Sequence, residues 1–170
     1  MYSTQVLITL PKTKRILEIT VTDGTDPLTG ATVTINGDSE TTDSDGEAEF
    51  ELYEGEYTVT ATKSSYTTVS DVVDLNEHNT TLTIALEVTD TITITVDDGA
   101  DTPAAIEGAK VVIGETEKTT DSNGQCTFTD MTYDDYTVSV TAEGYEDEEE
   151  TIQFRSNHKS FTISLTESEP

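Results

Sequence analysis

Residues 41–66, TTDSDGEAEFELYEGEYTVTATKSSY, contain a turn, an aromatic segment and a Ser-Tyr ending that return in residues 119–145, TTDSNGQCTFTDMTYDDYTVSVTAEGY. The threonines that open the two stretches lie 78 residues apart, whereas Tyr57 and Tyr136 lie 79 apart. The two stretches are therefore two copies of one module, and the second copy is one residue longer between its turn and its tyrosine. Two repeats of about 75 residues, each long enough to close one core, account for nearly the whole chain.

Apolar and polar residues alternate with a period of two through both repeats, which is typical of strands with one buried face. Turn signals rich in Gly, Asp, Asn and Pro separate these segments, and no helical periodicity occurs. The sequence therefore predicts an all-β protein made of two antiparallel β-sandwiches. The predicted inward rows begin with Leu17, Ile19, Val21 in the first repeat and Ile92, Ile94, Val96 in the second.

We divide the chain into an N-terminal arm at residues 1–15, a first sandwich at 16–88 and a second at 91–166. The arm has no counterpart before the second repeat. Its apolar residues alternate until Pro11, and three cations follow; the residues to which we assign an assembly role are Val6, Ile8, Leu10, Lys12, Lys14 and Arg15. Two interpretations stay open, an edge strand folded back on the first repeat or an arm that adds a strand to another subunit.

The formal net charge is −27, and the acidic residues lie almost entirely in the repeats. The arm has three basic residues and no acidic one, whereas residues 16–90 have one basic and seventeen acidic and residues 91–170 four and eighteen. This balance excludes nucleic-acid phosphates as a partner, because their binding needs basic side chains. It favours solubility and keeps copies apart except where a specific contact forms.

The sequence predicts no membrane span, since no apolar run approaches about 20 residues. Residues 1–15 also lack the apolar core and cleavage site of a secretory signal. We therefore expect the chain, if it is the full natural product, to reach its destination by assembly.

The repeats resemble the carboxypeptidase regulatory-like domains and their Cna B-type, transthyretin-like relatives. The resemblance covers residues 16–166 and rests on the Thr-Asp-x-Asp/Asn-Gly turns and on these elements: Gly30-Ala31-Thr32-Val33 and Gly108-Ala109-Lys110-Val111, Phe50 and Phe128, Tyr57 and Tyr66, Tyr136 and Tyr145. It implies two tandem Ig-like or transthyretin-like antiparallel β-sandwiches with an extended N-terminal arm. Such domains serve as spacers, stalks and adhesive modules, so the fold alone does not assign a function.

The Cna B branch of this resemblance often carries a Lys–Asn isopeptide bond, with the lysine on the first strand and an acid four residues after the tyrosine. The expected first strands, Ile16–Thr22 and Thr91–Val96, have no lysine, and Ala61 and Val140 occupy the acid positions. We therefore predict no isopeptide bond in either repeat. An intact mass lower than calculated by about 17 Da, one ammonia, would contradict this.

Three features of the sequence resemble binding sites, but a structural role explains each of them better than ligand binding does. Asp43-Ser44-Asp45-Gly46 resembles the start of a calcium loop and reaches Glu54 at the twelfth position, but its glycine stands at the fourth position instead of the sixth. A hairpin turn explains it better. The acidic run at residues 146–150 suits a solvated edge, with cation binding or a basic partner as the alternative. His78 and His158 stand alone on equivalent turns, which is a poor basis for a metal site.

The only cysteine, Cys126, matches Ala48 of the first repeat and is expected to pack as a small hydrophobe. No phosphate loop, nucleophile elbow or His/Cys cluster occurs, so the sequence predicts neither an enzyme nor a cofactor.

We first expect a non-enzymatic structural or display module of a larger extracellular assembly, namely a phage or virus surface protein such as a capsid decoration, head fibre or tail-surface subunit. Other subunits would bind the arm, and the resemblance implies cell-surface glycans as further partners. The alternatives are an extracellular cell-surface or pilus-like adhesin stalk and a carbohydrate-binding accessory module.

Overall fold

The computed structural model describes residues 12–169, which form strands and turns. The chain divides into two compact units, Met1–Glu87 (unit 1) and Val88–Pro170 (unit 2). The arm residues Val6, Ile8 and Leu10 lie outside the described residues. Within them, no helix is long and apolar enough to cross a membrane.

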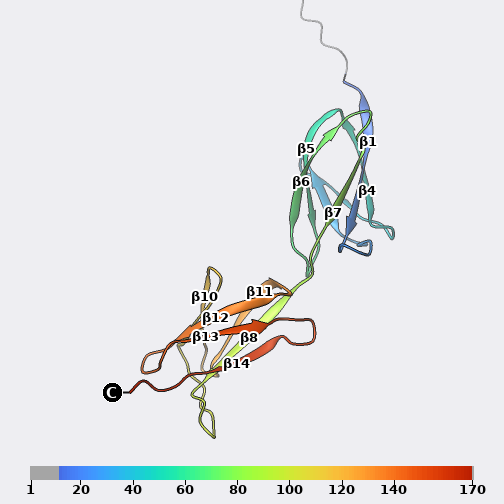
Figure 1. Ribbon diagram of the computed structural model, residues 1–170. Coiled ribbons are helices and arrows are strands. Elements are labelled where there is room, and N and C mark those ends of the chain that lie inside the picture. The colour runs from blue at the N-terminus through green and yellow to red at the C-terminus, as the bar shows by residue number, and fades with distance from the viewer. Residues whose placement is uncertain (1–11, 170) are drawn as a thin grey trace, which may run out of the picture. The chain divides into compact units, whose positions relative to one another are not determined.

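Unit 1 is a two-layer sandwich of a three-stranded and a four-stranded sheet (Figure 1). The first has the order β4-β1-β7 and the second β3-β2-β5-β6. Their strands are β1 (Lys14–Thr22), β2 (Thr32–Ile35), β3 (Asp38–Thr41), β4 (Glu47–Tyr53), β5 (Gly55–Thr62), β6 (Val69–Leu75) and β7 (Thr81–Ala85).

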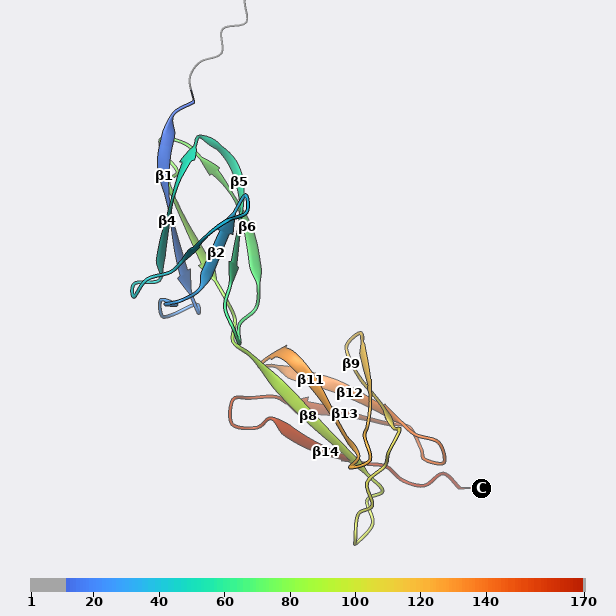
Figure 2. The ribbon, with the colours of Figure 1, turned by 180° about the vertical axis from the view of Figure 1, so that it is seen from behind.

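Unit 2 repeats this architecture with the sheets β11-β8-β14 and β10-β9-β12-β13 (Figure 2). Its strands are β8 (Thr89–Asp97), β9 (Lys110–Ile113), β10 (Thr116–Thr119), β11 (Gln125–Thr132), β12 (Asp135–Thr141), β13 (Glu148–Gln153) and β14 (Ser160–Ser164). The all-β prediction and the tandem sandwiches are thereby confirmed.

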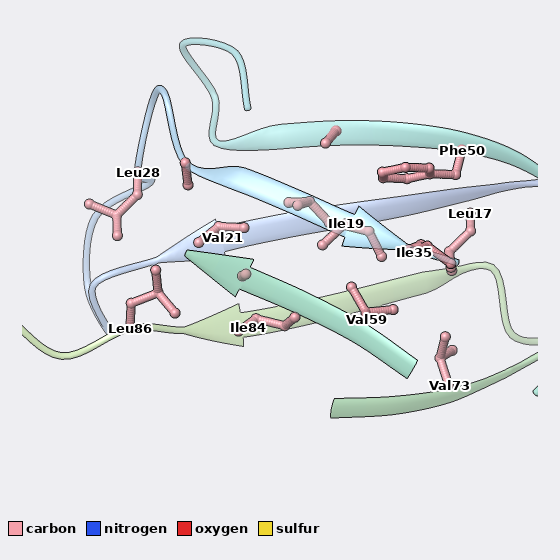
Figure 3. Close-up of a cluster of buried hydrophobic side chains, with 14 of the residues drawn as sticks. Leu17, Ile19, Val21, Leu28, Ile35, Phe50, Val59, Val73, Ile84 and Leu86 are labelled. Atoms are coloured by element: carbon pink, nitrogen blue, oxygen red, sulfur yellow. The ribbon is translucent and has the colours of Figure 1, made fainter. Parts of the chain in front are cut away.

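The core of each unit lies between its two sheets and contains the predicted rows. In unit 1, Leu17 and Ile19 of β1, Phe50 of β4 and Val59 of β5 belong to one cluster of buried side chains between the sheets (Figure 3). All four side chains are buried, as the alternation of each strand requires. Unit 2 buries the equivalent Ile92, Ile94, Val138 and Phe128.

One pair of strands in each unit is parallel, which the predicted antiparallel pattern did not include. β1 pairs with β7 in parallel, and β8 pairs with β14 in the same way. All other strand pairs are antiparallel. The parallel pair arises because the last strand crosses from the neighbourhood of β6 or β13 to the opposite sheet, so it runs beside the first strand in the same direction.

Short hairpins place an additional edge strand, β3 or β10, that alternation did not predict. Asn36 and Gly37 both have positive φ, 54° and 92°, as a two-residue type I′ turn requires. In unit 2 Gly114, with φ 60°, begins the corresponding two-residue turn. All side chains of β3 and β10 are exposed, so neither strand has the alternation of apolar and polar residues by which the other strands were predicted.

The inserted residue that offsets the repeats is a β-bulge in β11. Phe128 faces Ile92 and Met131 faces Asp90, so three steps along β11 match two along β8. Asp130, within the bulge, has the left-handed φ of 59°. A bulge adds one residue to a strand without breaking the sheet, which explains how the repeats keep one fold despite the change from 78 to 79.

Candidate functional site

The repeated Thr-Asp turn before β4 and before β11 is closed by its own aspartate. Oδ1 of Asp43 accepts hydrogen bonds from the backbone N–H groups of Asp45 and Glu47, at 2.9 and 3.0 Å. Asp121 does the same with Asn123 and Gln125, and these bonds hold the pKa of the Asp121 carboxyl below its usual value. The geometry is that of an Asx-type hairpin turn, in agreement with that interpretation of the sequence.

The glycine of each turn lies against the first strand of its unit. Gly46 has φ 76°, and a Cβ built there would lie 2.6 Å from the backbone oxygen of Val21 and 2.9 Å from Cβ of Pro27. Its carbonyl accepts a hydrogen bond from the Val21 N–H at 2.8 Å. Gly124 has φ 70° and lies in the same way against Val96. Only glycine suits this backbone and this space together.

A buried threonine completes each turn. The Thr42 hydroxyl donates to the Leu28 carbonyl at 2.5 Å and accepts from the Ala31 N–H at 2.9 Å. The Thr120 hydroxyl makes the equivalent contacts with Ile106 and Ala109. Thr42 and Thr120 are 3% and 4% exposed, so each fixes the loop between the first two strands from inside the protein.

Cys126 lies on β11 with its side chain in the core of unit 2. Burial raises the pKa of its thiol. Both observations agree with the expected packing role, since a reactive thiol needs exposure and a lowered pKa.

In the described part of the chain, no three His, Cys, Asp or Glu side chains lie close enough together to hold a metal ion. Nδ1 of His78 lies 3.4 Å from Oε1 of the neighbouring Glu77. His158 packs on the Phe161 ring, with 4.3 Å between ring centroids. Glu148–Glu150 lie exposed on the edge strand β13.

A polar cluster of Asp90, Tyr133 and Lys159 in unit 2 escaped the sequence analysis. The Asp90 carboxylate accepts hydrogen bonds from the Lys159 ammonium and, at 3.0 Å, from the Tyr133 hydroxyl. The bond with Lys159 lowers the pKa of Asp90 and raises that of Lys159, while burial and Asp90 raise the pKa of Tyr133. No local signal could reveal the cluster, because Asp90 and Lys159 are 69 residues apart in sequence.

This cluster is a charged pair at neutral pH and not a pair prepared for amide formation. Condensation needs a neutral amine and a protonated carboxyl, whereas both pKa shifts favour the charged forms. The side chains are also 42% and 30% exposed for Lys159 and Asp90, so water screens the pair. The absence of an isopeptide bond stays a prediction for both repeats, and the intact mass tests it.

Of the predicted arm, the structure describes the three basic residues, Lys12, Lys14 and Arg15. β1 begins at Lys14, so Lys14 and Arg15 are strand residues and not arm residues. Lys14 Nζ lies 2.8 Å from Oε2 of Glu51, and Arg15 Nε lies 2.6 Å from Oε1 of Glu54. The strand is longer than predicted because these two pairs and the β4 ladder extend it beyond the apolar row. Lys12 is exposed.

Comparison with known proteins identifies the repeats. The family model of the carboxypeptidase regulatory-like domain matches residues 16–87 and again 91–166. No curated protein matches the chain.

Among solved structures, a streptococcal ancillary pilin is similar to this chain, with 16% sequence identity and a TM-score of 0.50; the match covers 91% of this chain and 62% of the pilin chain. The Bacillus anthracis TIE protein is 24% identical, with coverage of 91% and 34% and a TM-score of 0.44. The minor pilin GBS52 of Streptococcus agalactiae is 18% identical, with coverage of 91% and 97% and a TM-score of 0.42.

The chain thus spans about three fifths of the length of the ancillary pilin structure and about a third of that of the TIE protein. The likeness to the ancillary pilin agrees with the sandwich fold described above. Because the family model covers most of the sequence in two successive matches, the chain belongs to the carboxypeptidase regulatory-like domain family and carries two of its domains in tandem.

Proposed function

We propose that this chain is a non-enzymatic structural module of a cell surface, a stalk segment that holds other parts of a surface protein or filament away from the cell. The family and the fold support this proposal, and so does the likeness to a protein described as an ancillary pilin. The comparisons favour this alternative over the virion-surface protein that the sequence analysis puts first, for which they offer no support.

The observation that carries the proposal is the position of the first and last strands in each unit. β1 and β7 are adjacent, parallel and hydrogen-bonded, with Glu18 facing Thr81 and Thr22 facing Ala85. Tension applied to the two ends of the unit would pull β1 and β7 past each other along their length. All bonds of the ladder would then resist together, whereas bonds pulled from one end break one after another.

Unit 2 has the same arrangement, with β8 and β14 paired in parallel from Thr93–Ser160 to Asp97–Ser164. The chain leaves β7 at Ala85 and enters β8 at Thr89. A tandem chain of such units would pass tension from one shear-loaded pair to the next through a three-residue connection. This suits a stalk under pull, such as an adhesive surface structure.

Immunogold electron microscopy of the source cells and of particles purified from their medium tests the proposal. Antibodies raised against the purified chain should label the exterior of intact cells, on filaments or on the envelope. Label restricted to virions, or found only after the cells are opened, would overturn it. Pre-absorbing the antibodies with the purified chain provides the control.

A further inference from the structure

The structure contains two edge strands without any charged residue. Within residues 12–169, the sheets of both units have eight edge strands, and six of these carry Asp, Glu or Lys: β3, β4, β6, β10, β11 and β13. Charge on an edge strand discourages another strand from pairing with it. The exceptions are β7, Thr-Leu-Thr-Ile-Ala, and β14, Ser-Phe-Thr-Ile-Ser.

The outer side of β14 presents backbone groups that the described residues do not pair. Lys159 O accepts from the Thr93 N–H, and Leu165 N–H donates to the Asp97 carbonyl, so the odd-numbered residues face β8. By alternation, the backbone N–H and C=O groups of Ser160, Thr162 and Ser164 point away from β8.

Pairing on this outer side begins only beyond the strand, where the Thr166 carbonyl accepts from the Glu146 N–H. No backbone bond to the outer side of residues 160–164 occurs in the described part of the chain. Phe161, whose side chain faces the core, is only partly buried next to this open edge. An added strand would pair the backbone groups and cover the ring.

The chain itself supplies a strand of matching chemistry. Residues 2–10, YSTQVLITL, are uncharged and alternate Val6, Ile8 and Leu10 with other residues. Nine residues exceed the five of β14, so the segment can cover the whole edge. Two copies of a chain with charge −27 repel each other, and an uncharged strand meeting an uncharged edge is the approach with the smallest electrostatic cost.

The charges that flank the two partners are complementary. Lys12, two residues after the segment, is exposed, and the exposed Glu148–Glu150 lie on β13, which contacts β14 in the same unit. β7 is the second uncharged edge, but it belongs to the unit that the segment directly precedes, so within one copy pairing there would close the chain on itself. β14 of another copy therefore fits a structural module that extends by adding subunits.

We propose that residues 2–10 of one copy add as an extra strand to the open edge of β14 in a second copy and so join copies head to tail. The inference rests on the proposed structural function but names the partner, a second copy of this chain, and the edge that accepts it.

The test measures self-association of the full chain by sedimentation velocity over a range of concentrations. Thr162→Pro removes an N–H that the unit does not use and places a ring on the outer edge, a change that edge strands tolerate. We expect it to weaken association at least tenfold, and deletion of residues 1–11 to do the same. Thr83→Pro, the matched change in β7, should leave association intact.

Thr162→Lys serves as a second variant, since it adds an edge charge without a proline. Circular dichroism melting verifies that each variant folds. A synthetic peptide of residues 2–12 should slow amide exchange of Thr162 in the truncated chain but not of Thr83.

A monomeric full chain would overturn the proposal, as would association that Thr83→Pro abolishes and Thr162→Pro leaves unchanged. Neither result bears on cell-surface display, which immunogold labelling decides separately.

Discussion

Replacing Gly46 by alanine tests whether the repeated turn locks the first strand of unit 1. Gly46 combines φ 76° with a Cβ position 2.6 Å from the Val21 oxygen and 2.9 Å from Pro27 Cβ. An alanine must therefore both adopt a left-handed backbone and displace its neighbours. Gly37 is the matched control, because its φ of 92° is also left-handed but nothing lies within 4 Å of its Cβ position.

The expected cost at Gly46 has three parts. A left-handed alanine costs about 1–2 kcal/mol, which Gly37→Ala also incurs. Overpacking against Val21 and Pro27 adds about 1–3 kcal/mol. Disturbing the bond from the Val21 N–H to the Gly46 carbonyl adds about 1 kcal/mol. Gly46→Ala should therefore destabilise unit 1 by about 3–6 kcal/mol, a large part of the 5–15 kcal/mol typical of a domain.

Scanning calorimetry of the full chain measures this difference, and hydrogen exchange assigns each transition to a unit. A domain of this size loses about 4–8 °C in Tm per kcal/mol, so Gly46→Ala should lower the Tm of unit 1 clearly more than Gly37→Ala. Equal effects of the two variants would refute the packing argument and leave only the conformational cost. Gly124→Ala should repeat the result in unit 2.

Three further outcomes follow from single side chains. Thr42→Val should cost about 2–4 kcal/mol, since the Ala31 N–H and the Leu28 carbonyl lose their partner, against about 1 kcal/mol for Thr42→Ser; equal costs in urea titrations would contradict the hydrogen-bond argument. Cys126 should react with a thiol reagent only at the rate at which unit 2 opens, because it is buried and its thiol pKa is raised; fast reaction of the native chain would show it accessible. Backbone N–H groups lower the pKa of Asp98, so its contribution to stability is present above about pH 4 and lost as the pH falls through the folded pKa. Asp98→Ala should therefore lower the Tm at pH 7 and converge with wild type in acid; a constant gap across the pH range would contradict this.

Alternation predicted most of the fold because each strand has one buried and one exposed face. The rows containing Leu17, Phe50 and Val59 are buried as expected, and the equivalent rows of unit 2 agree. The edge strands β3 and β10 left no such pattern, since no residue of either is buried. The parallel pairing of β1 with β7 was equally hidden, because residue alternation carries no information on strand direction.

The candidate site was predictable where the chemistry is local and not where it is distant. The Asp43 turn follows from the Asp and Gly residues next to it, whereas the hydroxyl of Thr42 bonds to Leu28, fourteen residues away. Asp90 and Lys159 meet only through the pairing of β8 with the end of the β13–β14 connection. The arm residues Val6, Ile8 and Leu10 keep their assembly role as a proposal.

Single-molecule pulling tests most directly the claim that each unit is built to carry tension. In a Cys126→Ala background, one experiment pulls the chain through its two ends and loads β1 and β7 in shear. A second pulls through cysteines placed at the exposed Thr25 and Glu87, which follow neighbouring ends of the two strands, and peels the same ladder open from one end. The account predicts that unit 1 unfolds at a higher force when pulled through the ends. Equal or lower force in that direction would contradict it.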